Sequence, residues 1–232
     1  MKKSFLVVLL FATSIAFSQE NSIKTNLFGI SYGSYGLTYE REIVPGNTLS
    51  LSGAYWNLNY GFMPIFDWAS FTGSVKLTDM YSGFHTTLEY RFYMNKEIMS
   101  GFYMAPYARY AQHNLMLFDE IRGTNFDVET KLSGLALGFQ MGYQWVLSKG
   151  FTIDWFFVGL GVERYVINGN YVTANSSSFN YSTIVKDVRD VFEGWNYFEK
   201  RLTTDSYNDR LHVKLPFLGP SFRSGFSIGY AF

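Results

Sequence analysis

Few residues in this chain have the types and spacing that catalysis needs. The three histidines, His85, His113 and His212, are never four residues apart, as a helical metal site requires, and the chain contains no cysteine. Asp127 and Glu129 have the spacing of paired carboxylates on a strand, but their surroundings favour a solvated loop edge over acid–base catalysis. We therefore expect no metal, no cofactor and no enzymatic activity.

Two further patterns that can carry chemistry lack their structural context. Gly159-x-Gly161 is not followed by the turn and helix that a phosphate-binding loop needs. No serine lies in a nucleophile-elbow motif. These residues are better explained as parts of a strand face and of loops.

Ionisable residues that share one face of alternating segments form a better candidate site. Acids and bases are nearly balanced among them, and a charge enclosed in a narrow interior needs a partner, so we expect a network of ion pairs. Glu89, Arg91 and Arg109 are its expected centre because they fall on neighbouring segments. An ion or proton path is the alternative. The candidates are Lys24, Glu40, Glu42, His85, Glu89, Arg91, Arg109, Glu163 and Arg223.

These charged residues belong to segments in which bulky apolar residues alternate with small or polar ones. Between Leu135 and Leu147, every second residue is Leu, Phe, Met, Tyr or Trp, whereas the intervening positions hold Ala, Gly, Gln and Val. Similar alternation recurs in 84–92 and 222–232. A repeat of two residues is typical of β-strands, because successive side chains point to opposite faces. We therefore expect an all-β fold.

The composition indicates which face points outward. Aromatic residues make up 20% of the chain and charged residues 16%, with a mean hydropathy of −0.02. Soluble domains carry about 25% charged residues, and the glycine-rich face here has too few charges to cover a surface in contact with water. We therefore expect the bulky face to contact lipid and the small face to line a narrow interior. A soluble, lipocalin-like binder with the opposite orientation is the alternative.

Eight segments are predicted to form one closed, antiparallel, up-and-down transmembrane β-barrel. Their connections alternate between short (44–47, 95–101, 148–150) and long (60–82, 113–130, 166–219), as periplasmic turns and extracellular loops do. The predicted strands are 22–31, 35–44, 48–59, 83–94, 102–112, 131–147, 151–165 and 220–232. Aromatic residues gather beside the short turns, as an interfacial girdle would: Phe92, Tyr93, Phe102, Trp145, Phe151, Trp155, Tyr230 and Phe232.

The long extracellular loop 166–219 contains a predicted amphipathic helix at about 182–202. Its apolar residues recur at helical spacing opposite charged ones. We expect its apolar face to pack on other loops. Capping of the barrel mouth, contact with the membrane surface and docking of an extracellular partner are the alternatives. The apolar residues are Ile184, Val188, Val191, Phe192, Trp195 and Phe198.

Both ends of the chain carry signals for export to the outer membrane. Lys2 and Lys3 precede an apolar run that ends at Ala16-Phe17-Ser18, which is typical of a secretory signal peptide over 1–18 and leaves 19–232 as the barrel. The run is too short for a membrane-spanning helix. A terminal Phe232 is typical of strands recognised by the outer-membrane assembly machinery. We therefore expect this chain in the outer membrane of a diderm bacterium, in contact with its lipid.

Several short motifs resemble those of small uncharacterised outer-membrane barrels of Bacteroidetes-type bacteria, a domain-of-unknown-function family. They are Lys24-Thr25-Asn26-Leu27, Gly36-Leu37-Thr38-Tyr39-Glu40, Gly142-Tyr143-Gln144-Trp145 and Gly219-Pro220. More loosely, the architecture is similar to that of OmpA-like barrels. The resemblance covers nearly the whole chain after residue 18 and implies a membrane-spanning barrel; its motifs mark strands and turns and not a reaction, so no catalytic residue is carried over from the family. The segment 166–219 is longer than the compact family pattern.

We expect a structural or surface-interaction role in the outer membrane, with an interior filled by polar and charged side chains. A net charge of zero without a basic patch argues against binding to nucleic acid. A narrow, porin-like pore or transporter for small solutes is the first alternative. An outer-membrane lipid-modifying enzyme is the least favoured, because it would need a histidine, a serine and a carboxylate that converge near the rim.

Overall fold

The computed structural model describes residues 20–31, 33–57, 81–95, 97, 99–121, 124–173, 182–190, 192–207 and 210–232. The predicted signal peptide and most of the predicted 60–82 loop lie outside these residues. The strands are β1 (Asn21–Asn26), β2 (Ser34–Val44), β3 (Asn47–Asn57), β4 (Tyr81–Tyr93), β5 (Gly101–Ile121), β6 (Thr124–Val146), β7 (Phe151–Thr173), β8 (Thr203–Ser206) and β9 (Arg210–Ala231). The helices are α2 (Leu27–Ser31), the 3₁₀ turn η4 (Ser148–Gly150), α4 (Ser182–Asp190) and α5 (Asn196–Glu199).

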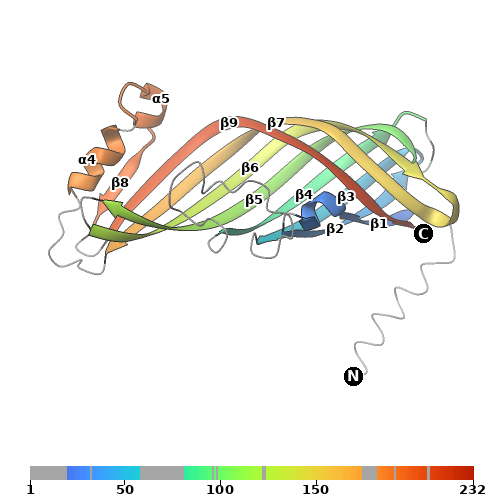
Figure 1. Cartoon of the computed structure of the whole chain (residues 1–232). Helices are drawn as coiled ribbons and strands as arrows, with labels where there is room; N and C mark the ends of the chain where they lie inside the picture. Colours follow the sequence, from blue (N-terminus) through green and yellow to red (C-terminus); the bar gives the residue numbers. More distant parts are fainter. Residues whose placement is uncertain are drawn as a thin grey trace, which may run out of the picture.

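The strands form one antiparallel sheet that closes on itself. Each strand pairs with the next from β1 to β7, β7 pairs with β9, and β9 pairs with β1 from Ser22↔Ala231 to Asn26↔Ser227. The result is a closed ring of eight strands, with the short β8 attached to β9 outside it (Figure 1). The predicted all-β class, strand number and up-and-down antiparallel order are confirmed.

Tight turns connect the strands at one end of the ring, which we call the turn end. Pro45 and Gly46 join β2 to β3, and Gly46 has a φ of 80°, a conformation that glycine adopts without steric cost. Gly150, with a φ of 83°, similarly precedes β7. Asn21 and Phe232 exchange backbone hydrogen bonds of 3.1 and 2.8 Å at this end. The ends of the ring-forming chain therefore meet at the turn end.

Four strands continue well past the others at the opposite end, which we call the far end (Figure 1). β5 and β6 pair from Gly101↔Gln144 to Ile121↔Thr124, and β7 pairs with β9 over the same extension. The predicted long loop 113–130 is therefore wrong, since residues 113–121 and 124–130 are strand.

The predicted loop 166–219 is also shorter than expected. β7 runs to Thr173, and β9 begins at Arg210. The alternation of bulky and small residues fades in these extensions. However, the backbone hydrogen bonds that hold two antiparallel strands together do not depend on that alternation. The strands therefore continue beyond the segments that the pattern marks.

In the ring, bulky apolar side chains face outward and polar side chains face the interior, which is the reverse of the usual arrangement in water-soluble proteins. In β6, Leu137 and Phe139 point outward and are 65% and 44% exposed, whereas Gln140 points inward and is fully buried. Buried serines, threonines, glutamines and charged residues line the interior of the other strands as well. This is the orientation that the sequence predicts for the bulky and the small face.

Most of the predicted aromatic girdle lies on the outer face near the turn end. Phe92, Trp145, Phe151 and Tyr230 each expose more than a third of their surface. Tyr93 instead points into the ring and is buried. Its assignment to the girdle was wrong because consecutive residues of a strand, here Phe92 and Tyr93, face opposite sides.

A β-bulge in β7 changes which of its residues face inward. Its register shifts between Phe156 and Gly159, where β7 has one more residue than its neighbours. Before the bulge, the even-numbered Asp154 is buried inside the ring; after it, the odd-numbered Glu163 is buried inside. Both carboxylates therefore enter the interior although their numbers differ in parity.

The predicted helix over 182–202 is two short helices. Gly194 lies between α4 and α5 and has a φ of 83°, which is incompatible with a continuous right-handed helix. Ile184 of α4 is buried against Val128 and Leu211. These two residues have the inward parity of β6 and β9, so α4 packs over the inner face of the extension. None of the described helices is long and apolar enough to span a membrane.

Candidate functional site

A cluster of five charged residues fills the ring interior near the turn end; we call it the ion cluster. It consists of Lys24 from β1, Glu40 from β2, Glu89 and Arg91 from β4, and Asp154 from β7, and each is at most 4% exposed. Lys24 and Asp154 are 130 residues apart in sequence. These charges meet only because the ring is closed, since β1 is joined to β7 through β9.

Lys24 lies at the centre of the ion cluster. Its ammonium group donates to Glu40 Oε2 at 2.5 Å, to Gln144 Oε1 at 2.7 Å and to Asp154 Oδ2 at 2.7 Å. An ammonium group has three donors. Lys24 therefore has a partner for each of its hydrogens, as a buried charge requires.

Arg91 connects the remaining carboxylates. Its Nε and Nη2 donate to Glu89 Oε2 at 2.9 and 2.8 Å, and its Nη1 donates to Asp154 Oδ2 at 2.7 Å. A longer contact of 3.4 Å reaches Glu40 Oε2. The guanidinium carbon also lies 4.4 Å from the centre of the Tyr103 ring, an arrangement that stabilises a cation.

Neutral side chains supply the other hydrogen bonds of the ion cluster. The hydroxyl groups of Thr48 and Tyr93 donate to Glu40 Oε1 at 2.5 and 2.8 Å. Tyr103 Oη donates to Asp154 Oδ1 at 2.8 Å. Both oxygens of each of these two carboxylates thus accept hydrogen bonds, which lowers the free-energy cost of burying them.

Arg109 forms a separate ion pair further from the turn end. Its Nη2 donates to Glu163 Oε2 at 2.7 Å and contacts Ser221 Oγ at 3.3 Å. The prediction grouped Arg109 with Glu89 and Arg91. The structure separates them because Arg109 pairs across the strands with Thr87, one inward position beyond Glu89.

Arg223 adds a fourth cation, which pairs with the ion cluster through Glu89. Its Nη2 lies 3.1 Å from Glu89 Oε1, and its guanidinium carbon lies 4.8 Å from the ring centres of both Tyr107 and Phe156. Four interior cations then face four interior carboxylates: Lys24, Arg91, Arg109 and Arg223 against Glu40, Glu89, Asp154 and Glu163. The interior ion pairs of the described residues are therefore electrically balanced.

The last two predicted network residues lie outside the ion pairs. His85 Nδ1 accepts a hydrogen bond from Trp56 Nε1 at 3.0 Å. Glu42 Oε1 accepts from the backbone N–H of Gly46 at 3.1 Å and so stabilises the turn between β2 and β3. His85 is part of a cavity described below, whereas Glu42 has a structural contact only.

The other residues that could carry chemistry are dispersed. His113 Nδ1 lies 2.6 Å from Tyr81 Oη, and His212 Nδ1 lies 2.8 Å from Asn170 Oδ1. Asp127 and Glu129 are exposed on the β6 extension and not on a loop edge. Within the described residues, no group of three or more His, Asp or Glu has the geometry of a metal site.

Asp154 is the ion-cluster residue that the sequence analysis missed. Counting back from Glu163 in steps of two gives residues 155 and 153, which places Asp154 on the outer face. The bulge between Phe156 and Gly159 reverses that count. The sequence did contain a signal for Asp154, because it lies between the apolar residues Ile153 and Trp155. When its two neighbours face outward, a charged residue between them faces the interior of the ring.

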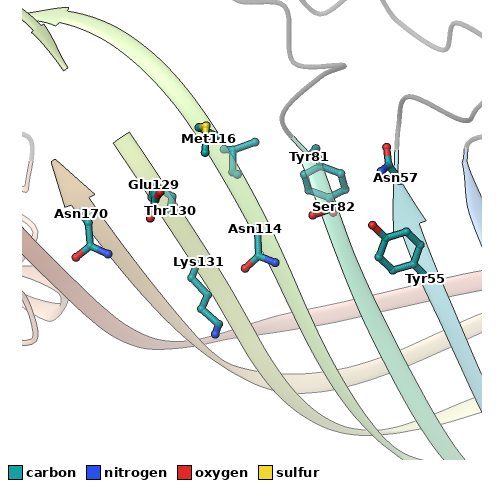
Figure 2. A pocket seen from close by; sticks show the side chains of 11 residues that line it. Tyr55, Asn57, Tyr81, Ser82, Asn114, Met116, Glu129, Thr130, Lys131 and Asn170 are labelled. Atoms are coloured by element: carbon teal, nitrogen blue, oxygen red, sulfur yellow. The ribbon is translucent and has the colours of Figure 1, made fainter. Parts of the chain in front are cut away.

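The outer surface carries a depression of about 500 Å³ at the far end of the ring (Figure 2). Figure 2 shows Asn114 and Lys131 on the neighbouring strands β5 and β6, with Asn57 and Ser82 on β3 and β4. Glu129 lies further along β6 in the same view. The lining combines polar, apolar and oppositely charged side chains, so it does not select one class of ligand.

Comparison with known proteins gives a family without a functional description. No curated protein and no solved structure matches the chain. One family model matches residues 4–187, which includes the ring from β1 to β7 and ends within α4. Because the match covers more than half of the sequence, the chain belongs to the family described as "Protein of unknown function (DUF3575)".

Proposed function

We propose that this chain is a small outer-membrane β-barrel protein with a structural or surface-interaction role, whose interior is sealed by the ion cluster. One observation carries the proposal: the ring exposes Leu, Phe, Tyr and Trp on its outer face and buries paired charges inside. A protein surrounded by water gains free energy from the opposite arrangement. A hydrocarbon environment accounts for both faces.

The lengths of the connections support an orientation in the membrane. The turn end has the short connections and both ends of the ring, as the periplasmic side of such barrels does. The far end has the extended strands, α4 and α5, which would project from the cell. Lipid would surround the outer face, and the final strand with Phe232 would be recognised by the assembly machinery. A Bacteroidetes-type diderm bacterium and an OmpA-like role are parts of this proposal.

An exposed aromatic surface at the far end supports a surface-interaction role. Trp195 is 65% exposed and Tyr207 is 59% exposed, and both lie beyond the ring. Phe198 of α5 packs 5.6 Å from Phe217 of β9, centre to centre, which holds this region against the extension. Aromatic residues are enriched in protein interfaces. An extracellular partner at 182–202 would contact this surface.

Cell fractionation followed by electrophoresis tests the membrane location and the barrel together. We expect the protein in the outer-membrane fraction, with a chain that begins at or near Gln19. An unheated sample in sodium dodecyl sulfate should migrate faster than a boiled one, because a closed ring of strands stays compact in the detergent. Recovery in the soluble periplasm, or identical mobility before and after boiling, would contradict the proposal.

A further inference from the structure

The wall of the ring is interrupted beside β1. β1 is six residues long, and its pairing with β9 ends at Asn26↔Ser227, although β2 and β9 both continue. After Asn26 the chain forms α2, which contacts both β2 and β9. In Figure 1 it is the short blue helix beside the red β9. Here the described residues of β2 and β9 are not joined by strand pairing.

A cavity of about 490 Å³ lies at this interruption; we call it the lateral cavity. Its lining includes Arg109, Arg223 and His85 with several serine and threonine residues, and no Asp or Glu is among its described lining residues. Leu37 and Phe222 also line it, and both point outward, with exposures of 64% and 72%. The lateral cavity therefore reaches the outer face of the ring between β2 and β9.

Both arginines of the lateral cavity retain unused donors. Arg109 Nε and Arg223 Nη1 are buried and meet no hydrogen-bond acceptor among the described residues. A buried donor without an acceptor is unfavourable. The oxygens of a phosphate or carboxylate form strong, charge-assisted hydrogen bonds with guanidinium groups. The chemistry of the lateral cavity thus favours an anionic group.

An open apolar groove of about 660 Å³ lies next to the lateral cavity on the outer face. Ile30 of α2, Leu37 and Phe84 are among its lining residues. Gly36, Gly53 and Ala54 line both the groove and the lateral cavity, as Leu37 and His85 do, so part of the wall between them is made of small residues. A compartment that favours an anionic group, in direct contact with an apolar groove, matches the two parts of an amphiphile.

We propose that the lateral cavity binds the phosphate or carboxylate head of a single-chain amphiphile that enters from the surrounding lipid, with its hydrocarbon chain in the outer groove. The entry route rests on the proposed membrane location. The ion cluster closes the ring on the turn-end side of the cavity, and the opening between β2 and β9 gives the amphiphile a route from the side. The volume lies within the range of about 300–1,000 Å³ that is usual for small-molecule sites.

Two variants separate the head site from the chain site. Arg109→Gln alone would leave Glu163 buried without its partner, so the head-site variant is Arg109→Gln/Glu163→Gln, with Arg41→Gln on the outer face of β2 as its control. Gly53→Phe is the chain-site variant. Gly53 is at an exposed, outward-facing position of β3, and a Cβ there would meet no atom within 4 Å, so the new side chain starts in open space on the side of the groove.

Isothermal titration in octyl glucoside, with dodecyl phosphate and inorganic phosphate as probes, tests the proposal. We expect the unmodified protein to bind dodecyl phosphate at least about tenfold more tightly than inorganic phosphate, a difference of about 1.4 kcal/mol. The head-site variant should bind both probes about tenfold or more weakly than the unmodified protein does. Gly53→Phe should lower the affinity for dodecyl phosphate only. Arg41→Gln should leave both affinities unchanged.

Three results would overturn the proposal. The first is equal affinity for the two probes, and the second is unchanged dodecyl phosphate binding in Gly53→Phe. The third is that neither probe binds, although the heat-dependent mobility of the sample shows that the protein is folded. Because the titration is done in detergent, its outcome does not depend on cell fractionation. Dodecyl phosphate binding by a protein found in the periplasm would contradict the proposed location while leaving the cavity's ligand class intact.

Discussion

Replacement of Arg91 by Met should lower the free energy of unfolding by about 3–5 kcal/mol, as the loss of one member of a buried ion pair typically does. Arg91 contacts three of the interior carboxylates, including Glu89 at 2.8 Å and Asp154 at 2.7 Å. Without it, these carboxylates remain enclosed with an excess of negative charge. Urea unfolding in lipid vesicles, followed by tryptophan fluorescence, would measure the loss.

Arg41→Met provides the matched control for this substitution. Arg41 neighbours Glu40 on β2, but it points outward and is exposed. The same chemical change there should alter the free energy of unfolding by about 0.5 kcal/mol or less. If Arg91→Met and Arg41→Met lowered the free energy of unfolding equally, the interior charges would be well solvated. The proposal of a sealed interior would then be wrong.

The second large effect should come from Lys24, and a second substitution should partly reverse it. Lys24→Met alone removes one of the two cationic partners of Glu40 and Asp154, with an expected cost of about 3–5 kcal/mol. Lys24→Met/Glu40→Gln removes one charge of each sign, so Arg91 and Asp154 still balance each other. The double variant should therefore be more stable than Lys24→Met.

A double-mutant cycle quantifies this recovery. Urea unfolding of the two single variants and the double variant should give a coupling energy between Lys24 and Glu40 of at least about 1 kcal/mol, since residues that share a buried network are rarely additive. If the losses in unfolding free energy of the two single variants add up to that of the double variant, the 2.5 Å contact between the two side chains contributes no coupling energy. Such additivity would argue that packing, not charge pairing, closes the ring.

The alternation of residue types was sufficient to place most interior charges. Each strand has a repeat of two, so one well-marked segment such as Leu135–Leu147 fixes the inward face of β6, and pairing fixes that of its neighbours. Glu40, Glu89 and Arg91 follow this count. The count fails where the repeat is broken, as at the bulge that brings Asp154 inside.

The partners within the interior could not be predicted from the pattern. Parity gives the face of a residue but not its height along the ring, which depends on the register between strands. Arg109 was therefore grouped with Glu89 although the register places it opposite Thr87 and near Glu163. The lateral cavity was missed for a related reason, because residues 27–31 continue the strand-like pattern but form α2.

The far end departs most from the predictions. The strands there extend beyond the ring, where both faces of a sheet can meet water, so polar residues such as Asp127 and Glu129 occupy strand positions. Such segments lose the contrast between a bulky and a small face. Their hairpins are held by backbone pairing, which leaves little trace in the residue types.

Conductance across a planar lipid bilayer tests most directly whether paired charges close the ring. The unmodified protein should insert without a steady current, and deletion of residues 182–202 should not open one, because the ion cluster lies near the turn end, far from α4 and α5. A large, steady conductance from the unmodified protein would contradict the account. A current that appears only after the deletion would place the seal in the segment with α4 and α5 and not in the contacts of Lys24 and Arg91.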